Sequence, residues 1–161
     1  VYLLDRSGAN VRRVTDSIGI DTEARFSPDG ASLYFVSDRG GGPQIYRQPV
    51  SGGAAQRVTF HGAYNISPAL SPDGKLLAYI TRGSGFKVMV MDLGTGEVRG
   101  ISDTNDDESP SFAPNSRYII YATKSGGRDV LMTSLTDGRG KAALVESGLD
   151  IREPVWGPYG R

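Results

Sequence analysis

Few residues of this chain have the types and spacing that catalytic or metal-binding chemistry requires. The sequence has no cysteine, no G-x-S-x-G nucleophile elbow and a single histidine, His61, so a Ser/His/Asp site lacks identifiable partners. The run from Asp103 to Glu108 begins like a calcium loop, because oxygen-bearing side chains follow one another along it. However, Glu108 occupies the place of the loop glycine and Pro114 that of the bidentate glutamate. We therefore expect no enzyme and no cofactor, with a weak Ca²⁺ site as the open alternative.

The elements that would position any site form an internal repeat. The copies are Phe26-Ser27-Pro28-Asp29-Gly30, Leu70-Ser71-Pro72-Asp73-Gly74, Phe112-Ala113-Pro114-Asn115-Ser116 and Trp156-Gly157-Pro158-Tyr159-Gly160. A period near 43 residues, with short apolar runs between glycine-rich turns, is typical of four-stranded propeller blades. Within each copy, proline sets φ at one corner of a turn, Asp or Asn bonds its own backbone, and Gly takes a positive φ.

The repeat predicts an all-β fold, a β-propeller of four-stranded antiparallel blades. At about 43 residues a blade, the chain holds fewer than the 4–8 blades of a typical closed ring, so we expect an incomplete ring of three full blades plus partial blades. The blades are predicted at 23–60, 67–102 and 109–146. Residues 1–16 are expected to form the last two strands of an earlier blade, and 152–157 a first strand that closes the ring. The chain thus resembles the carboxy-terminal part of a longer closed ring.

Composition excludes several classes of partner. The chain has 18 Lys and Arg residues against 18 Asp and Glu residues and no basic run, so nucleic acid is not expected as a partner. No stretch approaches the roughly 20 apolar residues that a membrane-spanning helix needs. The absence of cysteine is compatible with any compartment.

The candidate binding site is the mouth of the central channel. In a propeller, loops from the outer strand of one blade to the inner strand of the next gather there, and loops on a rigid scaffold commonly carry function. These loops are expected at 16–23, 61–67, 103–109 and 147–153. The candidate partner-binding residues are Thr22, Glu23, His61, Tyr64, Asn65, Asp107, Glu108, Arg152 and Glu153. The alternative Ca²⁺ site would also lie in this mouth.

Structural roles remain open for the same residues. Glu23, Glu108 and Glu153 recur at equivalent places, and their carboxylates would serve equally well to bond backbone N–H groups between blades. His61 is either a partner contact or a solvated loop residue. Tyr64 is either a rigid aromatic contact of the kind enriched at interfaces or part of the packing between blades.

An ordered series of motifs makes the chain similar to a known family. The series is Ser27-Pro28-Asp29-Gly30, Phe35-Val36-Ser37-Asp38-Arg39-Gly40-Gly41, Gln44-Ile45-Tyr46, Gly52-Gly53 and Gln56-Arg57-Val58-Thr59. It resembles the six-bladed propeller of the TolB family, periplasmic components of the Tol–Pal cell-envelope system, over essentially the whole chain. The resemblance implies a non-catalytic periplasmic protein whose channel mouth binds the peptidoglycan-associated lipoprotein Pal. It also implies that bacteriocins use the same surface in some relatives.

Parts of the family pattern are missing, and other propeller families share the turn motif. The amino-terminal α/β domain with its TolA-contacting extension is absent, so the resemblance does not extend TolA binding to this chain. The alternatives are the propeller of a prolyl-oligopeptidase-like peptidase, with a hydrolase domain after Arg161, and a polysaccharide-lyase propeller. The two ends of the incomplete ring are expected to expose unpaired strand edges and to favour self-association.

Overall fold

The computed structural model describes residues 1–157 and builds them from strands, turns and irregular segments. The strands are β1 (Tyr2–Leu3), β2 (Arg12–Arg13), β3 (Asp21–Phe26), β4 (Ser32–Ser37), β5 (Gln44–Pro49), β6 (Gln56–Arg57), β7 (Asn65–Leu70), β8 (Leu76–Arg82), β9 (Phe86–Asp92), β10 (Val98–Gly100), β11 (Glu108–Phe112), β12 (Tyr118–Ser125), β13 (Arg128–Leu135) and β14 (Ala142–Ser147). Over this part of the chain, no helix has the length and apolar character to cross a membrane. Pro158, Tyr159 and Gly160 of the last motif copy lie outside the described residues.

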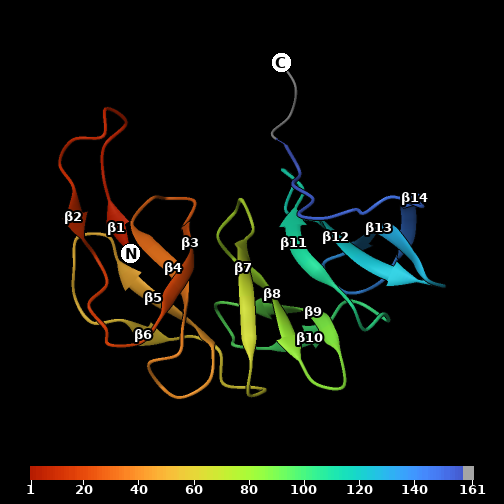
Figure 1. The fold of residues 1–161 in the computed structure, drawn as a ribbon, viewed down its shortest axis with the longest axis horizontal. Coiled ribbons are helices and arrows are strands. Elements are labelled where there is room, and N and C mark those ends of the chain that lie inside the picture. The colour runs from red at the N-terminus through yellow and green to blue at the C-terminus, as the bar shows by residue number, and fades with distance from the viewer. Residues whose placement is uncertain (158–161) are drawn as a thin grey trace.

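Three four-stranded antiparallel sheets form the body of the molecule. Their strand orders are β3-β4-β5-β6, β7-β8-β9-β10 and β11-β12-β13-β14, so each sheet is a meander in chain order. Figure 1 shows the sheets side by side in an open arc, with the β1–β2 hairpin next to the first sheet. The prediction of an all-β fold with four-stranded blades in an incomplete ring is therefore confirmed.

The predicted closing strand does not form within the described residues. Residues 152–157 take part in no strand ladder, although the sequence predicts a first strand there. The backbone N–H of Trp156 instead donates a hydrogen bond to Ser111 Oγ at 3.0 Å, which places the segment beside β11. A first strand is defined by pairing with the second strand of its own blade, and the described residues contain no such partner for this segment.

The hydrophobic core lies between neighbouring sheets. All six residues of β4 are buried, as its run of apolar residues on both faces predicts. One cluster joins the first and second sheets through Val36, Ile45 and Tyr79. Another joins the second and third sheets through Ile80, Val88 and Tyr121. The second sheet packs on both faces, against the first and third sheets, so the blades depend on one another for burial.

The repeated turn motif has the conformation that its residue types predict. In the first copy, the carboxylate of Asp29 accepts hydrogen bonds from Ser27 Oγ at 2.5 Å and from the Ala31 N–H at 3.0 Å. Gly30 has a φ of 70°, in the left-handed region that favours glycine. The third copy keeps this conformation with Ser116, at a φ of 58°. The turn is thus held by its own side chains and leads each inner strand into the second strand.

Buried polar side chains connect the outer strand of one blade to the inner strand of the next, and we call each such group a polar joint. In the first joint, Gln44 Oε1 accepts hydrogen bonds from Thr59 Oγ1 and from Asn65 Nδ2, both at 2.7 Å. The Thr59 hydroxyl in turn accepts the Ile45 N–H at 2.9 Å. Thr59 and Asn65 are fully buried, so these bonds form away from water, where leaving a group unpaired is costly.

The joint recurs one blade further along with different residues. Ser102 Oγ accepts the Val88 N–H at 3.1 Å, as Thr59 accepts that of Ile45. The carboxylate of Asp107, the first residue before β11, also lies 3.3 Å from the Val88 nitrogen and accepts the hydroxyl of Thr104. Each joint therefore links the third strand of one blade and the segment after its fourth strand to the beginning of the next blade.

The first joint predicts a specific loss of stability. Gln44→Met keeps the volume of the side chain but leaves the hydrogen-bonding groups of Thr59, Asn65 and the Gly62 carbonyl without their partner. We expect the free energy of unfolding to fall by about 1–3 kcal/mol, the cost of leaving buried polar groups unsatisfied. Urea denaturation measures it, with Gln56→Met on an exposed strand position as the matched control. Equal stability of the two variants would contradict a role for the joint.

The second turn predicts a pH dependence. The Ser71 hydroxyl and then, against partial burial, the Lys75 N–H lower the pKa of Asp73 from its ordinary value of 3.8. The stabilisation is therefore present above pH 4 and is lost as pH falls through the lowered pKa of the folded state. The stability advantage over Asp73→Asn should shrink between pH 7 and pH 3, and it should stay below about 1 kcal/mol because solvent screens the group.

Urea midpoints at several pH values test this, and the third turn offers a reciprocal control. Asn115 occupies the aspartate position there and accepts the Arg117 N–H at 3.0 Å. Ala113 stands where Ser71 donates its hydroxyl in the second turn, so Asn115→Asp should acquire a weaker pH dependence, of the same sign, than the one that Asp73→Asn loses. Parallel pH profiles for all three proteins would show that the turn carboxylate does not contribute.

Candidate functional site

Each of the three inner strands has a residue with left-handed backbone at its second or third position, and a fourth such residue lies in the C-terminal segment. We call these four residues the bulge positions. They are Glu23, Ser67, Ser109 and Glu153, with φ of 53°, 54°, 51° and 49°. In β3, β7 and β11, the strand register shifts at this point, which is the signature of a β-bulge. Bulges re-aim the neighbouring side chains and are common next to functional sites. The repeated bulge thus sets the direction of the residues that sequence analysis places at the channel mouth.

The first bulge position contacts the second. Glu23 is exposed, and its Oε2 accepts the backbone N–H of Ser67 at 2.5 Å. This is the carboxylate-to-backbone contact between blades that sequence analysis leaves open for Glu23. Thr22, the residue before it, is exposed and pairs with Val36 in the β3–β4 register. Glu23 therefore has a structural role, while Thr22 presents a free surface.

Two of the candidate residues lie in the interior. Asn65 is fully buried and Asp107 is 3% exposed, and both belong to the polar joints. Asn65 Nδ2 also donates to the His61 carbonyl at 2.8 Å, which holds the loop before β7. These two side chains therefore act on the mouth through the loops that they support, because their burial keeps them from a partner's reach.

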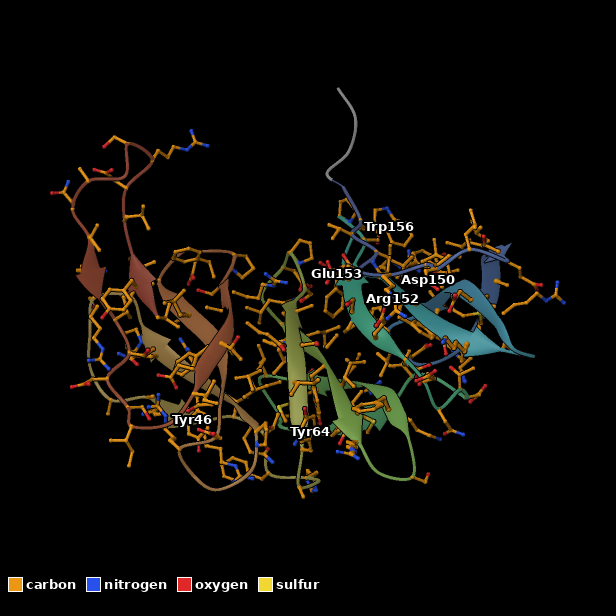
Figure 2. The ribbon with its side chains drawn as sticks, in the orientation of Figure 1. Tyr46, Tyr64, Asp150, Arg152, Glu153 and Trp156 are labelled. Carbon is orange, nitrogen blue, oxygen red and sulfur yellow. The ribbon has the colours of Figure 1, made fainter. Side chains whose placement is uncertain are left out.

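An aromatic and cationic group lies near the start of β7. The rings of Tyr64 and Phe86 meet edge to face with centroids 6.4 Å apart. The Arg82 guanidinium lies 5.9 Å from the Tyr64 centroid and 5.7 Å from that of Phe86, within cation–π range. Figure 2 shows Tyr64 near the lower end of β7. His61 is exposed in the same loop, so this loop offers both a rigid aromatic residue and a solvated one.

The last two candidate residues lie beside β11. Arg152 Nη1 is 3.7 Å from Glu108 Oε2, and Arg152 Nε is 3.5 Å from Asp150 Oδ2. Figure 2 shows Arg152 and Glu153 on the C-terminal segment where it passes β11. Glu108 and Arg152 each precede a bulge position, so their ion pair links neighbouring repeats as Glu23 and Ser67 do. Glu153 itself is exposed.

A polar cavity of about 210 Å³ lies next to this ion pair. Its lining residues are Asp106, Glu108, Ala122, Thr123, Lys124, Asp129, Ile151 and Arg152. Glu108 and Arg152 are among the residues predicted from the sequence to bind a partner, and Asp106 belongs to the acidic run considered for Ca²⁺. The other lining residues are not predicted. In the sequence, Thr123 and Asp129 have the pattern of ordinary strand residues. No motif in it indicates that β12 and β13 border a cavity.

The acidic run from Asp103 to Glu108 does not converge on one point. Asp103 Oδ2 pairs with Lys141 Nζ at 2.7 Å, whereas Asp107 is bonded within its polar joint. The Asn105 carbonyl accepts the Phe86 N–H at 2.8 Å, which ties the loop to β9. Among residues 1–157, no group of three or more His, Cys, Asp or Glu side chains is arranged to hold a metal ion. The residues of the run therefore do not fit the Ca²⁺ alternative.

Burial changes the pKa of Tyr121, which lies near this run. Burial raises the pKa of Tyr121 to about 12, and the carboxylates of Asp107 and Asp103 add to the increase. Its phenol therefore stays neutral at physiological pH. Within residues 1–157 the hydrogen bonds and ion pairs join the candidate residues in pairs, and no single network connects all of them.

Comparisons of the sequence and of the structure with known proteins point to the same family. The TolB beta propeller domain family matches residues 1–160. The Tol-Pal system protein TolB of Bordetella pertussis is 48% identical over 163 residues, which cover 100% of this chain and 37% of the relative. The crystal structure of TolB from Acinetobacter baumannii superposes with a TM-score of 0.89 at 46% identity, covering 98% of this chain and 40% of that one.

More distant structures share the fold alone. A puromycin-hydrolyzing peptidase of Mycobacterium tuberculosis superposes with a TM-score of 0.76 at 19% identity, covering 91% of this chain and 26% of that chain. The chain spans well under half the length of the TolB proteins that it matches. The family match and the high identity over the whole sequence agree with the three-bladed architecture. The chain belongs to the TolB β-propeller family.

Proposed function

We propose that this chain is a non-catalytic, protein-binding propeller of the Tol–Pal system, which binds the lipoprotein Pal at the channel mouth. The proposal places it in the periplasm, where such binding supports the integrity of the outer membrane. It rests on the relatives, which are named Tol-Pal system protein TolB and match the chain over its full length. One structural observation supports it most directly, namely the exposed side chains held at or beside the bulge positions.

The surface of the mouth suits recognition of a protein. Thr22 and Glu153 are exposed, and Arg152 adds a charge of opposite sign. Tyr64 is half-buried against Phe86, so it is a rigid aromatic contact with little side-chain entropy to lose. Tyr64 lies near the lower end of β7, whereas Arg152 and Glu153 lie on the C-terminal segment beside β11, so the surface offers an aromatic contact and a charged contact at separate places (Figure 2). Charged contacts favour specific docking of one partner over others. The bulges in β3 and β11 lie beside Thr22 and Glu108 and hold these two residues on their sheets, which limits the motion that binding must restrict.

The proposal covers only partners that could bind the part of a TolB protein that this chain matches. Because the chain spans 37% of its Bordetella relative, contact with TolA is not included. Bacteriocins that exploit the same mouth would compete with Pal for the same exposed side chains. No observation on the described residues favours a peptidase or a lyase, and the peptidase that resembles the chain shares its fold alone.

Calorimetric titration with purified Pal tests the proposal. The chain should bind Pal saturably, and the double variant Thr22→Ala, Glu153→Ala should bind about five- to tenfold more weakly. This corresponds to about 1–1.4 kcal/mol, as expected for two exposed contacts at the interface. Lys75→Ala is the control, because Lys75 lies in the turn after β7, at the other end of that strand from the bulge position.

If the chain does not bind Pal, a full-length TolB protein shows whether missing blades or a wrong functional assignment is the cause. Binding of Pal by a full-length TolB protein that carries this segment, but not by the chain itself, would show that other blades supply essential contacts. Binding by neither protein would overturn the proposed function. Light scattering beforehand establishes how many copies associate, since self-association would mask part of the surface.

A further inference from the structure

Two residues that line the cavity beside β11 each have a buried polar atom with no hydrogen-bond partner. Glu108 Oε1 and Thr123 Oγ1 are buried and unpaired, and both residues line the cavity. Thr123 is 2% exposed. Of the three such side-chain atoms among residues 1–157, only Asn65 Oδ1 lies elsewhere. Buried polar groups are nearly always satisfied, and each unsatisfied one costs about 1–3 kcal/mol, so two in one hollow indicate a place prepared for a ligand.

The charges around the cavity indicate the kind of ligand. Asp106, Glu108 and Asp129 contribute three carboxylates, against the cations of Lys124 and Arg152. Glu108 Oε1 is an acceptor only, because an ionised carboxylate has no hydrogen to donate. Its other oxygen already lies 3.7 Å from Arg152 Nη1. An added ligand must therefore bring hydrogen-bond donors and positive charge, and an anion would meet unfavourable carboxylates.

The shape of the cavity favours an organic cation over a metal ion. No group of three or more His, Cys, Asp or Glu side chains in the described part of the chain is arranged for a metal. A volume of about 210 Å³ exceeds that of a bare ion and admits an ammonium or guanidinium head with part of its alkyl stem. The lining is almost entirely polar, so the charged head occupies the cavity and the methylene stem lies toward its open side.

The cavity is also in a place that a bound protein can reach. Glu108 precedes the bulge position Ser109, and Arg152 precedes the bulge position Glu153. The hollow therefore lies between two consecutive repeats at the ends of their inner strands, beside exposed residues that we assign to partner binding. Ammonium and guanidinium groups form short, charge-assisted hydrogen bonds with carboxylates, which are stronger than neutral ones.

We propose that this cavity receives the cationic head of a lysine or arginine side chain from the bound protein partner. The head donates hydrogen bonds to Glu108 Oε1 and Thr123 Oγ1, while Asp129 and Asp106 add electrostatic attraction. This inference rests on the proposed function, since it names the chemistry of one contact with that partner. It assigns a binding role to Thr123, which is otherwise a buried strand residue.

Two variants test the contact in the titration with Pal. Thr123→Val and Glu108→Gln should each weaken binding about tenfold, the effect of losing a hydrogen bond to a charged group. Thr123→Val should leave the melting temperature of the free chain unchanged or raised, because it removes a buried hydroxyl that has no partner. Weaker binding without lower stability is a combination that a purely structural role would not produce.

Matched controls come from the same chain. Thr136→Val lies just beyond the far end of β13 from Asp129, and Glu97→Gln is exposed in the second sheet. Both should leave binding of Pal unchanged. Wild-type affinity in Thr123→Val and Glu108→Gln, with Pal bound normally, would overturn the cavity inference and leave the proposed function intact.

A second probe examines the cavity without Pal. Nα-acetyl-lysine methylamide, titrated into the labelled chain, should cause saturable NMR shifts at the amides of Thr123, Lys124 and Asp129. The shifts should disappear in Glu108→Gln and with the Nε-acetylated analogue, which lacks the charge. Shifts without Pal binding would keep the cation site but remove Pal as the source of the cation. Absence of these shifts would overturn the site, whereas the proposed function is overturned only if a full-length TolB protein that carries this segment also fails to bind Pal.

Discussion

The rest of the structure depends on the polar joints between blades. A propeller sheet packs against its neighbours through apolar side chains, which attract without specifying orientation. The joints add direction, because Thr59, Gln44 and Asn65 must meet with hydrogen-bonding geometry inside the core. They form where one blade ends and the next begins, so they hold the relative position of two sheets. The mouth loops are anchored at the same points, which ties the binding surface to the rigidity of the core.

The fold could be predicted from the sequence because its signals are local and repeated. The Pro-Asp-Gly turns and the strand Ser32–Ser37, which is apolar on both faces, can each be predicted from their own residues. The structure confirms both. The bulge positions were not predicted, because glutamate and serine, unlike glycine, do not indicate a left-handed backbone conformation. The ladder expected for residues 152–157 is missing because a strand needs a partner that lies outside its own sequence.

The candidate site was only partly predictable, because a polar residue in the sequence can be either exposed or buried in a hydrogen-bond network. Asn65 and Asp107 occur at the expected places, but a polar residue at a strand start is equally suited to a surface and to a buried network. The neighbouring blade decides between them, and this is long-range information. Thr123 shows the converse, because nothing in the sequence distinguishes a threonine facing a hollow from one facing packed side chains. The mouth thus combines buried residues that hold the loops with exposed residues that remain available.

The fourth bulge position has a consequence for how such a ring closes. Glu153 adopts the left-handed conformation of the other three, although its segment takes part in no strand ladder. The contact of Trp156 with Ser111 holds this segment beside β11, although a left-handed φ is unfavourable for glutamate by itself. A partner strand that joins it therefore meets a template with part of its conformational entropy already lost. If residues 152–157 close a ring as the sequence predicts, their partner strand docks onto a segment that is already held beside β11.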